Sequence, residues 1–355
     1  MPYSRLTPQE ARAILAAHLP QSPIEPPQAS FRSYLLHYTP RPATYLVTFQ
    51  LLEPSAVESP LSVPNNLQAQ YKLLSALHVH ISSELPTIPL PFPVPIALNV
   101  DVPRPYILAR LSVPLTSSAS LKQLATVRNS LPPERVASLD LRLGLALRTL
   151  HNLQSEWCGP PTLERDGLYS WQETFTLLIE ETLSAADLAG LVSAIDITAL
   201  RSYLARAIGA YLFDDVEVPS LVALTTGAES VFITNDEEEP RLALLLPSFA
   251  HMLYGDPLIE RAFSPSETPS RALLEGYGAP PPIVFPRQRT KRMWYDLYLA
   301  LVVLLGAKRV GNDQDVDWAN TNARAVCRGQ AELESSTLNA SIETSHQHIV
   351  QSHTD

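Results

Sequence analysis

The sequence predicts an α+β chain in which a small strand-rich N-terminal part is followed by a larger helical part. Residues 31–37 and 45–52 are rich in aromatic and β-branched side chains and flank two prolines, which is typical of a hairpin-like pair of strands. Residues 84–105 are dense in proline, which forbids a regular helix. Beyond this segment, apolar residues recur at steps of three and four over residues 134–153, which predicts a long amphipathic helix.

The remaining elements follow from the same patterns. An N-cap-like Thr7-Pro8 before an apolar stripe predicts a helix at residues 7–19. The apolar run at 106–111 should be a buried strand near a hinge between the two parts. Further helices are expected at residues 66–77, 171–186, 197–211 and 292–307, and short strands at 221–223, 231–233 and 242–246.

The length of 355 residues suits one two-lobed body and a tail. We expect an N-terminal helix within residues 1–24, an N-terminal lobe at 25–112 and a helical C-terminal lobe at 113–310. Residues 311–355 are polar and hold no long apolar period, so we expect a tail that is disordered from about residue 330.

Composition excludes several classes of protein. With 45% hydrophobic and 17% charged residues, most of the chain should fold. The formal net charge is −10, and residues 287–292 form the only short basic run, so nucleic acid is not expected as a partner. The longest apolar stretch, 297–307, is too short to span a membrane, and the N-terminus has no apolar run of signal length. We therefore expect a cytoplasmic protein without a membrane partner, and free thiols at Cys158 and Cys327.

Three segments carry a resemblance to a known family. Residues 145–153 read Leu-Ala-Leu-Arg-Thr-Leu-His-Asn-Leu and precede Trp157-Cys158-Gly159, residues 254–258 read Tyr-Gly-Asp-Pro-Leu, and residues 294–301 read Trp-Tyr-Asp-Leu-Tyr-Leu-Ala-Leu. In this order and spacing they resemble the aminoglycoside phosphotransferase-like family, and its fungal branch most closely. The resemblance covers roughly residues 25–310, is weakest in the N-terminal lobe, and implies a bilobal protein-kinase-like fold.

The resemblance also identifies where catalytic residues are missing. The catalytic loop of the family reads His-Gly-Asp, then four residues, then Asn, and without gaps this window begins at Ala223-Leu224-Thr225 and ends at Ser230. Thr225 cannot act as the carboxylate that orients the acceptor hydroxyl, and Ser230 is a poorer magnesium ligand than Asn. The second magnesium carboxylate of the family falls on Ser248, which is neutral.

The nucleotide side of the site shows the same departure. The basic strand residue of the family falls on about Thr48, and its carboxylate partner on a helix falls on about Gln70. Independently of any alignment, the first glycine of the chain is Gly144, so the strand-rich lobe has no glycine-rich loop to close over a phosphate.

Other polar residues have simple structural interpretations. His78 and His80 lie too far from Cys or carboxylate pairs to favour a metal site, and His151 suits a helix C-terminus. Asp256 is expected to cap the helix after its motif. Asp214-Asp215 is where a substitute carboxylate would be sought if activity were found.

The sequence therefore predicts a noncatalytic kinase-like protein, a pseudokinase, that binds a small molecule or a protein. No cofactor or metal is then expected. The alternative is an ATP- and Mg-dependent phosphotransferase acting on hydroxyl-bearing small molecules with carboxylates from elsewhere in the chain. A third hypothesis is a pocket adapted to another reaction in fungal specialised metabolism.

Overall fold

The structure is a computed structural model, and it divides the chain into two compact units. The first comprises Met1–Thr174 and Val216–Pro282, and the second comprises Phe175–Asp215 and Ile283–Asp355. The residues whose structure is described are 8–18, 28–30, 33–38, 43–49, 65–84, 90–101, 105–112, 121–161, 168–191, 196–224, 230–234, 241–245, 249, 251–263, 269–278 and 286–310.

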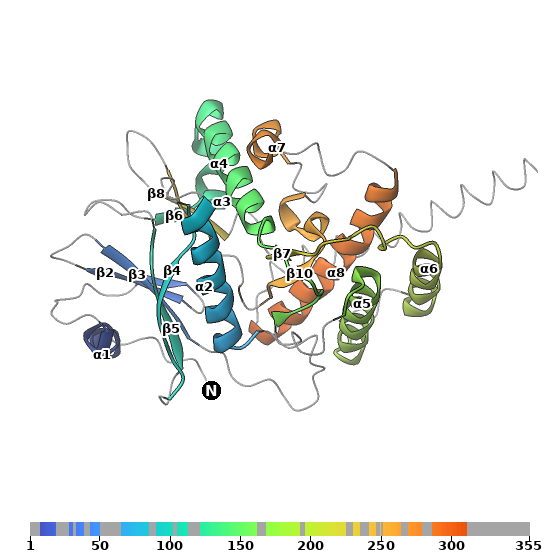
Figure 1. The fold of residues 1–355 in the computed structure, drawn as a ribbon, viewed down its shortest axis with the longest axis horizontal. Coiled ribbons are helices and arrows are strands. Elements are labelled where there is room, and N and C mark those ends of the chain that lie inside the picture. Colours follow the sequence, from blue (N-terminus) through green and yellow to red (C-terminus); the bar gives the residue numbers. More distant parts are fainter. Residues whose placement is uncertain are drawn as a thin grey trace, which may run out of the picture. The chain divides into compact units, whose positions relative to one another are not determined.

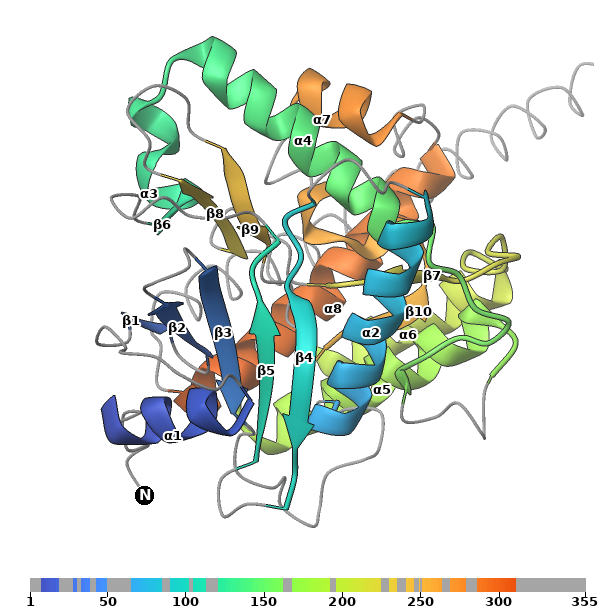
Figure 2. The same cartoon turned by 60° about the vertical axis from the view of Figure 1, so that its left-hand side comes forward.

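A five-stranded antiparallel sheet forms the strand-rich part of the first unit (Figure 1), and its strands follow the order β1-β2-β3-β5-β4 (Figure 2). The short helix α1 (Pro8–His18) precedes it, and α2 (Leu67–Glu84) lies along β4 and β5 (Figure 2). The strands are β1 (Gln28–Ser30), β2 (Ser33–Tyr38), β3 (Ala43–Phe49), β4 (Val94–Asn99) and β5 (Tyr106–Arg110).

Strand β4 lies inside the proline-rich segment, where no strand was predicted. Pro95 is tolerated because β4 is at the edge of the sheet and its register with β5 shifts between Pro95 and Ala97. Proline lacks the N–H that a central strand would need, but an edge or an irregular position does not require it.

Two helices of the first unit meet at close backbone distance. Helix α4 (Pro133–His151) follows α3 (Leu124–Val127) and a 3₁₀ turn, η1 (Arg128–Ser130), and it packs against α7 (Arg271–Tyr277). A Cβ added at Gly144 would lie 2.1 Å from the Leu273 carbonyl oxygen, and one at Gly276 would lie 1.9 Å from that of Leu141. The two glycines therefore allow the helices to cross.

Two small sheets complete the first unit. Strands β6 (Leu121–Gln123), β8 (Val231–Thr234) and β9 (Leu242–Leu245) form one, and β7 (Ser220–Val222) pairs with β10 (Leu253–Gly255) in the other. The 3₁₀ turns η4 (Pro257–Ile259) and η5 (Arg261–Phe263) follow β10. A single apolar core joins α2 to these strands and includes Leu74, Leu77, Leu221, Val231 and Met252.

The second unit consists of the helices α5 (Trp171–Leu188, from Phe175 onward), α6 (Ile197–Gly209) and α8 (Pro286–Val310). Four aromatic rings form its centre, with Phe175 in edge-to-face contact with Tyr295 and Tyr298 and a tilted contact with Phe213. Burial, with a smaller contribution from the charge of Glu181, raises the pKa of Tyr298 well above its ordinary value.

Most predicted elements are confirmed with shifted ends. Helix α2 runs past residue 77 to Glu84, and α8 begins at Pro286, six residues before the predicted start. The elements α3, α7, β6 and β10 were not predicted, because each is only three to seven residues long and too short for a periodic signal. The polar tail at residues 311–355 lies outside the described residues, and the predicted lobe boundaries stay predictions.

A search of the described helices for one long and apolar enough to cross a membrane finds none.

Candidate functional site

The segment that aligns with the catalytic loop begins directly after β7. Ala223 is fully buried, and Leu224 is buried with a φ of 58°, in the left-handed region. Leucine rarely adopts this conformation, whereas glycine adopts it readily. Leu224 therefore holds a backbone conformation that glycine would adopt without strain. Thr225 lies outside the described residues, and Ser230 is half-buried immediately before β8.

A buried carboxyl group anchors this segment. Oε1 of Glu260, a fully buried residue just after η4, accepts a 2.6 Å hydrogen bond from the Ala223 N–H. The same oxygen lies 3.3 Å from Nε2 of His151, the last residue of α4. His151 Nδ1 lies 2.8 Å from the hydroxyl of Tyr277 at the end of α7. The four groups tie the loop to α4 and α7.

The hydroxyl of Tyr277 is the group of this cluster whose pKa is clearly shifted. Burial raises its pKa well above the ordinary range, and the negative charges of Glu260 and Asp256 raise it further, against a smaller opposite effect of Arg148. Tyr277 therefore keeps its proton, and its hydroxyl can donate a hydrogen bond to His151 Nδ1 in the tautomer that carries its proton on Nε2, facing Glu260. His151 is the last residue of α4, where a structural role was predicted for it, and it lies buried in this cluster.

Sequence reasoning did not single out Glu260 or Tyr277. The available signal for Glu260 was a charged pair, Glu260-Arg261, between apolar residues in the run Leu-Ile-Glu-Arg-Ala-Phe that follows the Gly-Asp-Pro motif. Tyr277 had no comparable signal, because only the packing of α7 against α4 brings it to His151.

The aligned positions of the strand-rich lobe are occupied by neutral side chains. Thr48 is half-buried on β3, where it pairs with Ile107 of β5. Gln70, in the first turn of α2, donates from Nε2 to the backbone oxygen of Asn65 at 2.6 Å. Near them, Leu46 of β3 and Leu111 after β5 form one buried apolar cluster with Ala243 and Leu244 of β9.

The segment after β9 is fixed by side-chain contacts at both ends. Ser248 lies outside the described residues, but its neighbour Phe249 is buried, and the carbonyls of Phe249 and Met252 both accept hydrogen bonds from Asn65 Nδ2. Asp256 Oδ1 accepts from the Leu258 N–H at 2.9 Å and caps η4, as predicted.

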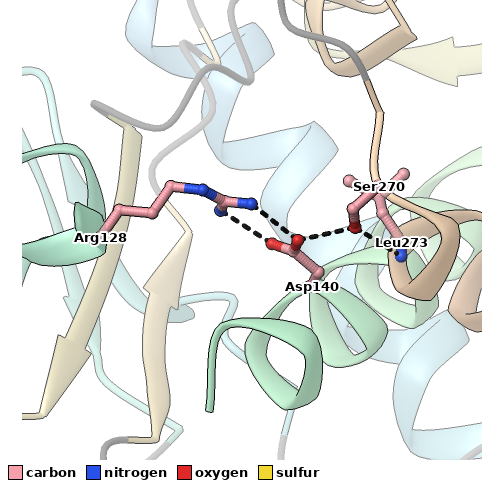
Figure 3. A network of polar contacts seen from close by, with 4 residues as sticks. All are labelled: Arg128, Asp140, Ser270 and Leu273. Atoms are coloured by element: carbon pink, nitrogen blue, oxygen red, sulfur yellow. Dashed lines mark hydrogen bonds and ion pairs between the residues drawn. The ribbon is translucent and has the colours of Figure 1, made fainter. Parts of the chain in front are cut away.

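A second polar network lies around Asp140, a buried residue of α4 (Figure 3). Arg128 of η1 donates to both carboxylate oxygens of Asp140, at 2.8 and 2.7 Å, and Ser270 Oγ donates to one of them at 2.7 Å. Ser270 also caps α7, because its Oγ accepts from the Leu273 N–H. The network borders an open groove of about 600 Å³ between η1, α4 and α7. Its charges are paired with one another, so we assign it a structural role.

Other candidate residues are also engaged in structure. Asp215 forms ion pairs with Lys291 and Arg287 of α8, within the second unit. Within the described part of the chain, no group of three His, Cys, Asp or Glu side chains lies close enough together to hold a metal ion. Cys158 is a free, buried thiol, and burial raises its pKa to about 11 against a smaller opposite effect of a Thr174 hydrogen bond.

Comparisons with known proteins give a likeness of fold alone. No family model matches the sequence, and no curated protein sequence matches it. A protein of Haemophilus somnus assigned as a fructosamine-3-kinase superposes with a TM-score of 0.56 at 14% identity, over 89% of this chain and 96% of its own. The aminoglycoside phosphotransferase APH(2")-IIIa, in complex with GDP and kanamycin, gives 0.56 at 13% identity, over 90% and 98%. Aminoglycoside phosphotransferase APH(4)-Ia gives 0.54 at 16% identity, over 91% and 99%.

Proposed function

We propose that this chain, which has a protein-kinase-like α+β fold with a small strand-containing lobe and a larger helical lobe, is a pseudokinase. In this proposal it binds a small molecule or a partner protein and transfers no phosphoryl group. We further propose that it is a cytoplasmic protein related to the fungal branch of the aminoglycoside phosphotransferase-like proteins.

The observation that carries the proposal is the neutral character of every aligned catalytic position. Kinase-type transfer uses a strand lysine paired with a helix glutamate, a loop aspartate, and an Asp and an Asn that hold Mg²⁺. The aligned residues here are Thr48, Gln70, Thr225, Ser248 and Ser230. Catalysis of this kind relies almost entirely on positioned charge, and a neutral hydroxyl or amide cannot offset the charge of a phosphate or of Mg²⁺.

The neighbouring carboxyl groups support the proposal, because they have structural partners. Glu260 accepts from a backbone N–H and faces His151, and Asp256 caps a 3₁₀ turn. A substitute base would have to leave one of these contacts, and a buried donor left without its partner costs about 1–3 kcal/mol.

The apolar cluster of Leu46, Leu111, Ala243 and Leu244 is a further supporting feature. It closes β3 directly onto β9 with side chains that are at most 4% exposed. Leu46 lies two residues before Thr48 on β3, so the two side chains face the same side of the strand. A nucleotide bound next to Thr48 would need space and polar partners on that side.

Thermal unfolding with ATP and MgCl₂ tests the proposal. A ligand present at a hundred times its Kd stabilises a protein by about 2.7 kcal/mol, which is readily visible as a rise in Tm. We expect no rise beyond that caused by MgCl₂ alone or by ATP with EDTA. A magnesium-dependent rise would favour the alternative, an active phosphotransferase for hydroxyl-bearing small molecules.

An ADP-release assay separates binding from turnover. We expect no release above the rate without protein for any hydroxyl-bearing acceptor, with kanamycin included because one structural neighbour binds it. Release that disappears when residues of the aligned loop are substituted would contradict the proposal.

A further inference from the structure

β3 and α2 carry no lysine–glutamate pair at the aligned positions Thr48 and Gln70, so the position of α2 must be fixed in another way. In active kinases the lysine and glutamate of this pair must be in place, and the position of the helix is thereby controlled. Thr48 and Gln70 cannot form such an ion pair. Another contact must therefore fix α2 against the residues that follow β9.

The structure places a buried amide at this junction. Asn65, immediately before α2, is only 3% exposed. Its Nδ2 donates to the carbonyl oxygens of Phe249, at 3.0 Å, and of Met252, at 2.8 Å, some 185 residues further along the chain. Both of these residues belong to the same apolar core as Leu67, Leu74 and Leu77 of α2.

Gln70 supports Asn65 from within α2. Its Nε2 donates to the Asn65 backbone oxygen at 2.6 Å, and Asn66 holds the first turn of the helix through its Oδ1, which accepts from the Ala69 N–H. The residue at the aligned glutamate position therefore faces Asn65. Oδ1 of Asn65 has no donor among the described residues, so the side chain serves here as a donor.

We propose that Asn65 is a positioning residue, which holds α2 in a fixed relation to Phe249 and Met252 without nucleotide. The Asn65 amide, with Gln70 behind it, takes the place of the charged pair. A hydrogen bond from a buried amide to a backbone carbonyl needs neither a phosphate nor a metal to form, so the arrangement is permanent rather than controlled by a ligand. The contacts stand on the structure alone, and only the comparison with the charged pair rests on the proposed function.

The test is hydrogen exchange, read by mass spectrometry at the amides of residues 249–255, in the full chain. Asn65→Asp keeps the shape of the side chain but removes its donors and directs carboxylate oxygens at two carbonyls. We expect exchange in this segment to rise by about tenfold or more, the change that the loss of one buried hydrogen bond produces. Asn65→Ala should raise it less, because it removes the donors without adding repulsion.

The matched control is Asn66→Ala, which removes only the helix cap next to Asn65. It should raise exchange in the first turn of α2 and leave residues 249–255 unchanged. Asn65→Asp should also recover part of its protection as the pH falls and the new carboxyl group gains a proton that it can donate.

Two results would overturn the proposal. The first is that the amides of residues 249–255 exchange almost as slowly in Asn65→Asp as in the unmodified protein, and more slowly than in Asn65→Ala. Packing alone would give that order, because Asp keeps the shape of Asn and Ala does not. The other is an equal effect of Asn65→Ala and Asn66→Ala on residues 249–255.

If Asn65→Asp does not fold, Gln70→Met removes the supporting donor at nearly constant volume. We then expect exchange at residues 249–255 to rise by about threefold. Nucleotide binding measured in parallel tests the proposed function separately, because the contact does not depend on it.

Discussion

At the scale of single residues, the first unit uses its buried polar groups as supports for backbone. Glu260 binds the Ala223 N–H, Asn65 binds two carbonyls and Asp256 binds the N–H of Leu258. Each satisfies a group that would otherwise be buried without a partner, which is costly in a folded protein. These buried polar groups therefore hold the described backbone around Ala223, Phe249, Met252 and Leu258 in place.

Substitution of Glu260 tests this framework. Glu260→Ala leaves the Ala223 N–H and His151 without their partner in the core, and we expect a loss of about 3 kcal/mol in the free energy of unfolding, measured with urea. Glu260→Gln, which keeps an acceptor oxygen, should lose about half as much. Glu275→Gln on the surface of α7 should change the stability by less than about 0.5 kcal/mol, because its ion pair with Arg271 is exposed. Equal effects of Glu260→Ala and Glu275→Gln would contradict the anchoring role.

The raised pKa of Tyr277 predicts that the folded protein loses stability at high pH. Its folded-state pKa is raised, so its contribution is complete below the unfolded-state pKa of about 10 and declines as the pH rises above that value. Between pH 9 and 11 the Tm of the Tyr277→Phe variant should therefore fall less steeply than that of the unmodified protein. Tyr211→Phe, at an exposed tyrosine, should leave the slope unchanged. Identical slopes in the unmodified protein and Tyr277→Phe would show that ionisation of Tyr277 is not coupled to unfolding.

We expect the thiol of Cys158 to be alkylated slowly in the folded protein. Its thiol is 1% exposed and has a pKa of about 11, so little reactive thiolate is present at pH 8. In a Cys327→Ser background, we expect iodoacetamide to modify Cys158 only as fast as the protein unfolds, with a rate at least about a hundredfold below that in urea. Fast modification without denaturant would contradict the buried position of the thiol.

At the scale of elements, the crossing of α4 and α7 decides where His151 and Tyr277 meet. Gly144 and Gly276 bring the two helix backbones into direct contact, and Ser270 and Gly278 end α7 with a side-chain cap and a left-handed turn. Asp140, Arg128 and Ser270 then join the opposite ends of the two helices (Figure 3). The geometry of the buried cluster thus depends on residues that are not part of it.

Alanine at Gly276 tests the crossing. The added Cβ would lie 1.9 Å from a backbone oxygen, so the helices must separate, and we expect a loss of about 2–3 kcal/mol in the free energy of unfolding. The control is Gly209→Ala in α6, where a Cβ meets nothing within 4 Å and helix propensity favours alanine by up to about 1 kcal/mol. Opposite signs for the two substitutions are expected in urea unfolding, and a neutral Gly276→Ala would disprove the close crossing.

At the scale of the whole molecule, the strand-rich part and the helical part of the first unit share one core. Leu67, Leu74 and Phe92 pack in the same cluster as Leu221 and Phe263, and the Leu245 N–H donates to the Pro91 carbonyl. Together with Asn65, these contacts hold α2 against the strands of the helical part, and Leu46 of β3 packs in a separate cluster with Ala243 and Leu244 of β9. Under the proposed function, charged residues introduced at Thr48, Thr225, Ser230 and Ser248 should therefore not create a nucleotide site.

Reintroduction of charge tests this expectation. In a variant with Thr48→Lys, Thr225→Asp, Ser230→Asn and Ser248→Asp, we expect no magnesium-dependent rise in Tm with ATP, because the apolar cluster around Leu46 remains closed and no glycine-rich loop precedes Gly144. A rise equivalent to about 2 kcal/mol or more would mean that charge alone had been missing.

The sequence by itself determined the order of the longer elements and the fold class, and the neutral residues expected at catalytic positions stay a prediction. Periodicity located α4, α5 and α6 to within a few residues, because an amphipathic helix repeats its apolar pattern over several turns. Only the tertiary structure decided which polar residues meet. The contacts of Asn65 with Phe249 and of His151 with Tyr277 join residues more than a hundred positions apart through short elements and glycine crossings, and such contacts leave no local pattern in the chain.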